Sequence, residues 1–161
     1  MLAQKRYFLS AKKYLSFLVF VWDLNQKKSI IELEMNSDVC GVRLRRDRII
    51  VIMESLIHIF SFSDVPKPLH VIDTFVNKDG VCALSSSMEN SLVAYPSSIS
   101  IGTIEVFDLG KEGGNVTRIA AHTHKICALT FNASGVKFNV EKYRRINSFL
   151  GNILASASEK G

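Results

Sequence analysis

The chain has 161 residues, of which 47% are hydrophobic and 22% are charged, and its mean hydropathy is +0.16. These values exclude an intrinsically disordered chain and predict a globular one that buries a core. The net charge of +5 and the pI near 9.2 favour an acidic partner, such as an anionic membrane, an acidic peptide or a nucleic acid, without choosing among them.

The N-terminal segment does not follow the pattern of the rest of the chain. It combines basic residues with a short apolar run at 15–20 and so resembles a secretory signal peptide. No small-residue cleavage site follows, and the run is shorter than the roughly 18 residues of a membrane-spanning helix. We therefore interpret residues 1–20 as an atypical, non-propeller N-terminal segment, and the chain as soluble.

Residues 21–24 (Val-Trp-Asp-Leu) and 106–109 (Val-Phe-Asp-Leu) resemble the strand-ending Trp-Asp pair of WD repeats. In such a pair we expect the aromatic side chain to point inward and the carboxylate to cap the turn that follows. This expectation concerns Trp22 and Asp23 in the first segment and Phe107 and Asp108 in the second.

Three cysteines mark an internal repeat, because Cys40, Cys82 and Cys127 stand in similar apolar strands. Their period of roughly 40–45 residues is typical of β-propeller blades. Three cysteines without a C-x-x-C spacing predict neither a disulfide framework nor a zinc site, and the reducing cytoplasm is the expected compartment.

Each complete repeat is predicted to hold four strands, the number expected of a propeller blade. The predicted strands, in chain order, are 29–34, 39–44, 48–53, 55–62, 69–74, 81–85, 91–95, 102–109, 116–120, 126–130 and 152–158.

The predicted fold class is therefore all-β, a partial WD-repeat β-propeller with about three of seven blades. The strand that follows Cys127 comes much later than its counterparts, which predicts an insertion near 136–151. We hypothesise that this insertion and the N-terminal segment are alternative or aberrant sequence, for instance translated intron. The partial propeller, 21–161, divides into a blade tail at 21–36, blades at 37–79 and 80–121, and an interrupted blade start at 122–161.

Several strings resemble the PROPPIN (WIPI) family of phosphoinositide-binding propellers. They are Val-Arg-Leu-Arg-Arg-Asp-Arg-Ile at 42–49, Leu-Val-Ala-Tyr-Pro at 92–96, Ala-His at 121–122 and Ala-Ser-Ala-Ser-Glu-Lys-Gly at 155–161. The resemblance implies a seven-bladed propeller that binds phosphatidylinositol 3-phosphate or the 3,5-bisphosphate. It further implies an autophagy adaptor that lies peripherally on preautophagosomal and endosomal membranes and recruits a lipid-transfer protein.

The family reads lipid headgroups with a Leu/Phe-Arg-Arg-Gly motif, in which paired guanidinium groups suit phosphate oxygens. This sequence does not contain that motif, so we expect impaired lipid binding. Residues 44–47 (Leu-Arg-Arg-Asp) are similar but have Asp for Gly and lie two blades too early. We expect them to form a solvated strand end.

For the first headgroup pocket, the resemblance carries over His122, Ser156, Ser158 and Lys160, whose side chains can donate hydrogen bonds to phosphate. Other roles stay open, because a histidine at this place in WD repeats also bonds within its blade, and serines cap turns. His124 stands where relatives often have a small hydroxyl residue.

No phosphate-binding glycine loop, metal-ligand set or nucleophile elbow is present, so we predict no enzyme, cofactor or small-molecule substrate. His122 and His124 lack a third metal ligand. Basic and aromatic residues near 137–149 could hold single-stranded nucleic acid, but we attribute them to the insertion.

The alternative that stays open is a WD-repeat scaffold for proteins that binds no lipid. Because a partial ring exposes strand edges, we expect the chain to fold poorly alone.

Overall fold

The computed structural model describes residues 7–12, 15–89, 91–111, 113–132, 145–149 and 152–158. All regular secondary structure in these ranges is β-strand, which confirms the predicted all-β class. No helix in the described part of the chain is long and apolar enough to cross a bilayer.

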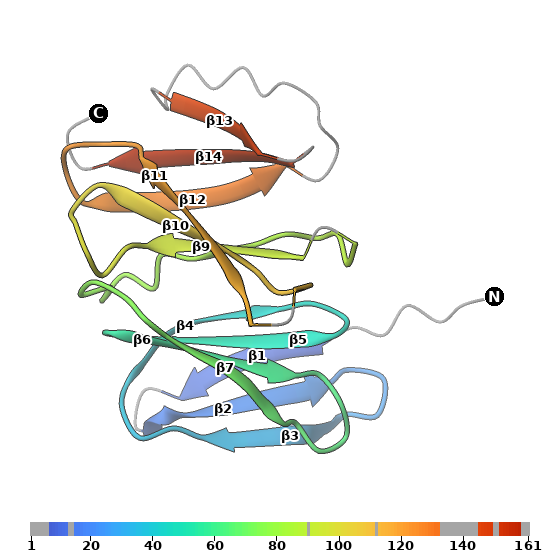
Figure 1. Ribbon diagram of the computed structural model, residues 1–161. Coiled ribbons are helices and arrows are strands. Elements are labelled where there is room, and N and C mark those ends of the chain that lie inside the picture. Colours follow the sequence, from blue (N-terminus) through green and yellow to red (C-terminus); the bar gives the residue numbers. More distant parts are fainter. Residues whose placement is uncertain are drawn as a thin grey trace.

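The strands form four antiparallel sheets, which Figure 1 shows in chain order from the bottom of the view to the top. Two sheets have four strands, β4-β5-β6-β7 and β8-β9-β10-β11, and two have three strands, β1-β2-β3 and β12-β14-β13. The strands are β1 (Tyr7–Lys12), β2 (Leu15–Asp23), β3 (Lys28–Glu34), β4 (Val39–Leu44), β5 (Arg48–Met53), β6 (Leu56–Ser61), β7 (Pro68–Asp73), β8 (Ala83–Leu84), β9 (Leu92–Pro96), β10 (Thr103–Asp108), β11 (Asn115–Ala120), β12 (Ile126–Asn132), β13 (Arg145–Phe149) and β14 (Asn152–Ser158).

Strand β5 explains how the sheets stack on one another. Side chains alternate between the two faces of a strand, and β5 is apolar on both. Ile50 belongs to a core shared with Tyr95 of the following sheet, whereas Val51 belongs to a core shared with Val21 of the preceding sheet. All four side chains are at most 1% exposed. The continuous apolar run is therefore buried between two neighbouring sheets.

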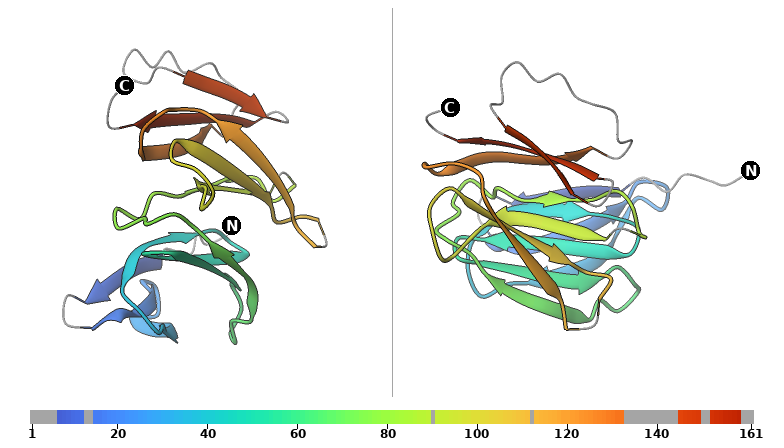
Figure 2. Two further views of the ribbon diagram at one scale, coloured as in Figure 1. Left: turned by 60° about the vertical axis from the view of Figure 1, so that its left-hand side comes forward. Right: turned by 45° about the horizontal axis from the view of Figure 1, so that its top comes forward.

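A third core repeats this arrangement one sheet further along the chain. Ala94 and Val106 of the β8–β11 sheet pack with Ile126, the first residue of β12. Figure 2 shows the resulting stack, with the N-terminal and C-terminal sheets at opposite ends. Meandering sheets that pack face to face in chain order are the arrangement of consecutive propeller blades.

The bounds of the observed sheets can be compared with the predicted segments of the chain. The two four-stranded sheets fall within 37–79 and 80–121, while the boundary between residues 20 and 21 falls inside β2. Strand β2 pairs with both β1 and β3, so the first sheet begins before that boundary. The assignment of blade boundaries stays a prediction.

The predicted insertion near 136–151 lies partly outside the described residues. Its described part forms β13, which pairs with β14. Strand β14 pairs directly with β12, although β12 ends at Asn132 and β14 begins at Asn152. By contrast, β4 ends at Leu44 and its neighbour β5 begins at Arg48. The segment that separates β12 from β14 is therefore much longer than its counterpart two sheets earlier.

The aromatic residues of the two Trp-Asp-like pairs differ in burial. Trp22 is 40% exposed, so the predicted inward orientation is wrong for this residue. The described core of its sheet lies on the face that carries Val21, and adjacent residues of a strand point to opposite faces. Phe107 is 9% exposed, and its inward orientation is confirmed, because the β8–β11 sheet contributes to a core on each face.

The predicted capping by both aspartates is confirmed. Asp23 Oδ1 accepts hydrogen bonds from the backbone nitrogens of Asn25 at 2.8 Å and Gln26 at 3.1 Å. Asp108 Oδ1 accepts one from the backbone nitrogen of Gly110 at 2.9 Å. Both carboxylates therefore satisfy donors in the turn that follows their strand.

Candidate functional site

The predicted site residue His122 lies in the loop between β11 and β12, residues 121–125, which we call the His122 loop. The Gly102 carbonyl oxygen accepts hydrogen bonds from the backbone nitrogens of Ala121 at 3.2 Å and His122 at 3.0 Å. Gly102 has a φ of 77°, and a Cβ there would lie 2.0 Å from the His122 carbonyl oxygen. Only glycine fits this position, and it fixes the loop backbone against the β9–β10 turn.

The side chains of the His122 loop are a cluster of hydrogen-bonding groups. His122 and His124 are half-buried, and Thr123 Oγ1 lies 2.9 Å from His124 Nδ1. Lys125 Nζ donates to Asp79 Oδ2 at 2.6 Å, which joins the loop to the segment that follows β7. Imidazole, hydroxyl and ammonium groups can each donate to phosphate oxygens. Sequence reasoning missed Lys125, although its place next to the two histidines was an available signal.

Strand β14 approaches the His122 loop through its pairing with β12. Ser158 is the register partner of Ile126, the residue that directly follows the loop, and Ser156 is the partner of Leu129. The backbone therefore brings Ser158 next to the loop and places Ser156 further along the strand. Lys160, the fourth predicted residue, lies outside the described residues. Contact of these residues with a lipid headgroup stays a prediction.

Arg45 of the Leu-Arg-Arg-Asp string does not form the solvated strand end that we expected. Its side chain is 6% exposed, and it donates to both carboxylate oxygens of Asp47, at 2.6 and 3.0 Å. It also donates to the carbonyl oxygens of Ser87 at 2.7 Å and Ser85 at 3.1 Å, and to Ser91 Oγ at 2.6 Å. The guanidinium group therefore links two sheets, and the expectation of a solvated strand end is wrong for this residue.

The electrostatics around Asp47 agree with this structural role. Burial alone would raise the pKa of the Asp47 carboxyl, but the hydrogen bond and charge of Arg45 and the charge of Arg48 outweigh burial and lower it. Arg43 makes a second link, from Nε to the Cys82 carbonyl oxygen at 3.0 Å and from Nη2 to that of Gly80 at 3.3 Å. Arg43 and Arg45 therefore both bind groups of the following sheet.

Antiparallel meanders that stack in chain order, with Asp-capped turns and arginine links between sheets, define a partial β-propeller of the WD-repeat class. Comparison with known proteins narrows this class. The sequence model of the PROPPIN family matches residues 16–161, and the chain belongs to this family.

Curated relatives are similar over most of this chain. It is 36% identical over 141 residues to WD repeat domain phosphoinositide-interacting protein 1 of Homo sapiens. This alignment covers 88% of this chain and 28% of the relative. It is 33% identical over 144 residues to Autophagy-related protein 18 of Caenorhabditis elegans. This alignment covers 89% of this chain and 31% of the relative. The chain thus spans less than a third of the length of these two relatives.

Solved structures support the fold. Hsv2p of Kluyveromyces lactis aligns with a TM-score of 0.68 at 23% identity, over 100% of this chain and 43% of its own. KlAtg21, in a complex with the coiled-coil of AgAtg16, aligns with a TM-score of 0.59 at 27% identity, over 71% of this chain and 37% of its own. The predicted PROPPIN resemblance and the partial-propeller fold are confirmed.

Proposed function

We propose that the chain contributes to phosphoinositide binding by a propeller that acts as an autophagy adaptor, and that it acts by binding and not by catalysis. The lipids are phosphatidylinositol 3-phosphate and the 3,5-bisphosphate. The observation that carries the proposal is the pairing of β14 with β12, which brings Ser158 next to the His122 loop. Two relatives are named for phosphoinositide interaction and for autophagy, and these names support the same function.

The chemistry of the site suits a phosphorylated headgroup. His122, Ser156, Ser158 and Lys160 are the proposed donors, and a fully ionised phosphate accepts several hydrogen bonds at once. The net charge of +5 adds a long-range attraction to anionic membranes, which weakens as salt is raised. Because Arg45 is occupied between sheets, the proposed site does not include it.

Binding of this kind would hold the protein peripherally on preautophagosomal and endosomal membranes. We propose a lipid-transfer protein of autophagosome growth as its protein partner there. The complex of KlAtg21 with the coiled-coil of AgAtg16 supports the general proposal that the propeller binds a protein partner.

Flotation with phosphatidylcholine vesicles tests the lipid proposal. Because the sequence contains no Leu/Phe-Arg-Arg-Gly motif, we expect weak flotation. The chain should still float more with vesicles that contain phosphatidylinositol 3-phosphate or 3,5-bisphosphate than with vesicles that contain unphosphorylated phosphatidylinositol. Lys160→Ala and His122→Gln should each lower flotation several-fold. Lys67→Ala is the matched control, because Lys67 is exposed between β6 and β7 and its loss changes the net charge equally.

Two outcomes would contradict the proposal. If both lysine variants lower flotation equally, net charge alone drives the association. If the chain floats equally with all vesicles, or with none, the alternative of a protein scaffold without lipid recognition is favoured.

A further inference from the structure

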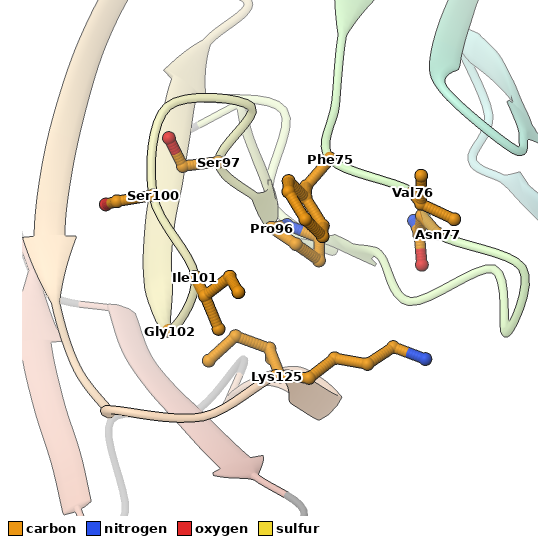
Figure 3. A pocket seen from close by; sticks show the side chains of 10 residues that line it. Phe75, Val76, Asn77, Pro96, Ser97, Ser100, Ile101, Gly102 and Lys125 are labelled. Atoms are coloured by element: carbon orange, nitrogen blue, oxygen red, sulfur yellow. The ribbon is translucent and has the colours of Figure 1, made fainter.

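A pocket of about 200 Å³ lies among three loops that are distant in sequence. Its walls are residues 75–77 of the segment after β7, residues 96, 97 and 100–102 of the β9–β10 turn, and residues 125 and 126 at the start of β12 (Figure 3). We call it the loop pocket. Its lining includes Lys125 of the His122 loop and Gly102, whose carbonyl oxygen holds that loop in place.

The rim of the loop pocket carries several exposed apolar side chains. Phe75 is 41% exposed, Val76 49% and Ile101 56%, and Ile99 of the same turn is 66% exposed. In Figure 3, Phe75 and Ile101 come from opposite loops and border the same opening. Apolar side chains that gather around a cavity on the surface mark interaction sites, whereas scattered ones do not.

The walls of the loop pocket are held by their own hydrogen bonds. Asn77 is 1% exposed, and its amide donates to the Val81 carbonyl oxygen at 2.9 Å and accepts from the Val81 nitrogen at 2.8 Å. The Gly102 carbonyl oxygen fixes the opposite wall to the His122 loop. The ion pair of Lys125 with Asp79 joins two of the three loops. A preformed cavity needs little ordering when a partner binds.

The volume of the loop pocket and the charge on its lining indicate which kind of group fits it. Its volume is below the roughly 300–1,000 Å³ of small-molecule sites, and it suits one large apolar anchor side chain of a protein partner. Among the lining residues Lys125 is the charged one, and its side chain is 36% exposed. An ammonium group has three N–H donors, so it can donate hydrogen bonds to Asp79 and to an incoming carboxylate at the same time.

We propose that the loop pocket docks a short segment of a partner protein in which a large apolar residue lies next to an acidic residue. The apolar side chain enters between Phe75 and Ile101, and the carboxylate pairs with Lys125. This inference goes beyond the lipid proposal, since it concerns a protein partner and needs no membrane.

Fluorescence anisotropy without lipid tests the docking proposal. The probe is a labelled peptide of sequence Ser-Gly-Asp-Leu-Asp-Gly-Ser. Two further peptides replace Leu by Ser, or both Asp by Lys. We expect saturable binding of the first peptide and affinities about tenfold weaker for the other two, because each lacks either the buried side chain or the charge pair.

Protein variants locate the binding. Ile101→Ser should weaken binding about tenfold, and Lys125→Glu should reverse the preference between the Asp and Lys peptides. Matched controls are Val65→Ser, at a 75% exposed apolar residue between β6 and β7, and Lys67→Glu in the same turn. Both controls should bind like the unmodified chain, because they lie away from the loop pocket. Ile101 is exposed, so Ile101→Ser should keep the fold. Lys125→Glu removes the ion pair with Asp79, so far-UV circular dichroism checks that this variant is folded.

Three results would overturn the docking proposal. One is the absence of saturable peptide binding at millimolar concentration. A second is equal weakening by Ile101→Ser and Val65→Ser. The third is a loss of flotation of Ile101→Ser with plain phosphatidylcholine vesicles while peptide binding stays unchanged, which would identify the apolar rim as a membrane contact. Failure of the lipid proposal would leave peptide binding unaffected, so the two proposals fail independently.

Discussion

Replacing Arg45 by alanine should weaken the contact between two neighbouring sheets. The change removes a 6% exposed guanidinium group and its hydrogen bonds to Asp47, Ser85, Ser87 and Ser91. Loss of one partner of a buried ion pair costs about 3–5 kcal/mol. Asp47 is 23% exposed and keeps Arg48 Nη1 at 3.1 Å, which favours the lower end, about 3 kcal/mol. For a chain of this size, the melting temperature should fall by about 6–12 °C.

Thermal unfolding followed by far-UV circular dichroism measures this effect, with Arg46→Ala as the control because Arg46 is the exposed neighbour. The difference between Arg45→Ala and the unmodified chain should also depend on pH. Because the folded state lowers the pKa of Asp47, the stabilisation is present above the ordinary carboxyl pKa and is lost as the pH falls through the folded value. Equal melting temperatures for Arg45→Ala and Arg46→Ala would refute the assigned link.

Three further predictions concern single residues. Burial raises the pKa of the Cys82 thiol to about 12, whereas Cys127 is exposed, so iodoacetamide should label Cys127 in the folded chain and Cys82 only after unfolding, as read by peptide mass spectrometry. Gly102→Ala should destabilise the fold in urea by at least about 1–3 kcal/mol, since its Cβ would clash with the loop after β11; an unchanged urea midpoint would contradict this. Burial, and then the charge of Glu105, raise the pKa of Tyr95, so the folded state holds this proton more tightly and stability should fall as the pH rises above 10.0. The fall should be smaller in Tyr95→Phe.

Strand positions could be predicted from the sequence where both faces of a strand are apolar. Strand β5, Arg48–Met53, has the predicted bounds, because a short β-branched run leaves little ambiguity. Strand β8 is shorter than the predicted 81–85. The first two residues of the predicted range are not in the observed strand, because their backbone groups bind side chains. The Val81 nitrogen donates to Asn77 Oδ1, and the Cys82 carbonyl oxygen accepts from Arg43 Nε. Such side-chain competitors are invisible to a period-two pattern.

The three cysteines show how position in a repeat differs from environment. Cys40, Cys82 and Cys127 occupy equivalent places in the sequence repeat, yet Cys40 is half-buried, Cys82 buried and Cys127 exposed. Cys82 lies in the core between the two four-stranded sheets. A repeat predicts the register of a residue, whereas burial depends on which neighbouring sheet covers it.

The sequence by itself determined the all-β class, the repeat, the PROPPIN family and His122 as a site candidate, because these depend on local pattern and on short strings. Only the tertiary structure decided that Arg45 links sheets, that Trp22 points outward and that the loop pocket exists. The Arg45 bond to Ser85 spans 40 residues of sequence, and the pocket walls come from three separate loops. The same arginine string suits a headgroup or a sheet contact, and the packing of the next sheet against it selects between them.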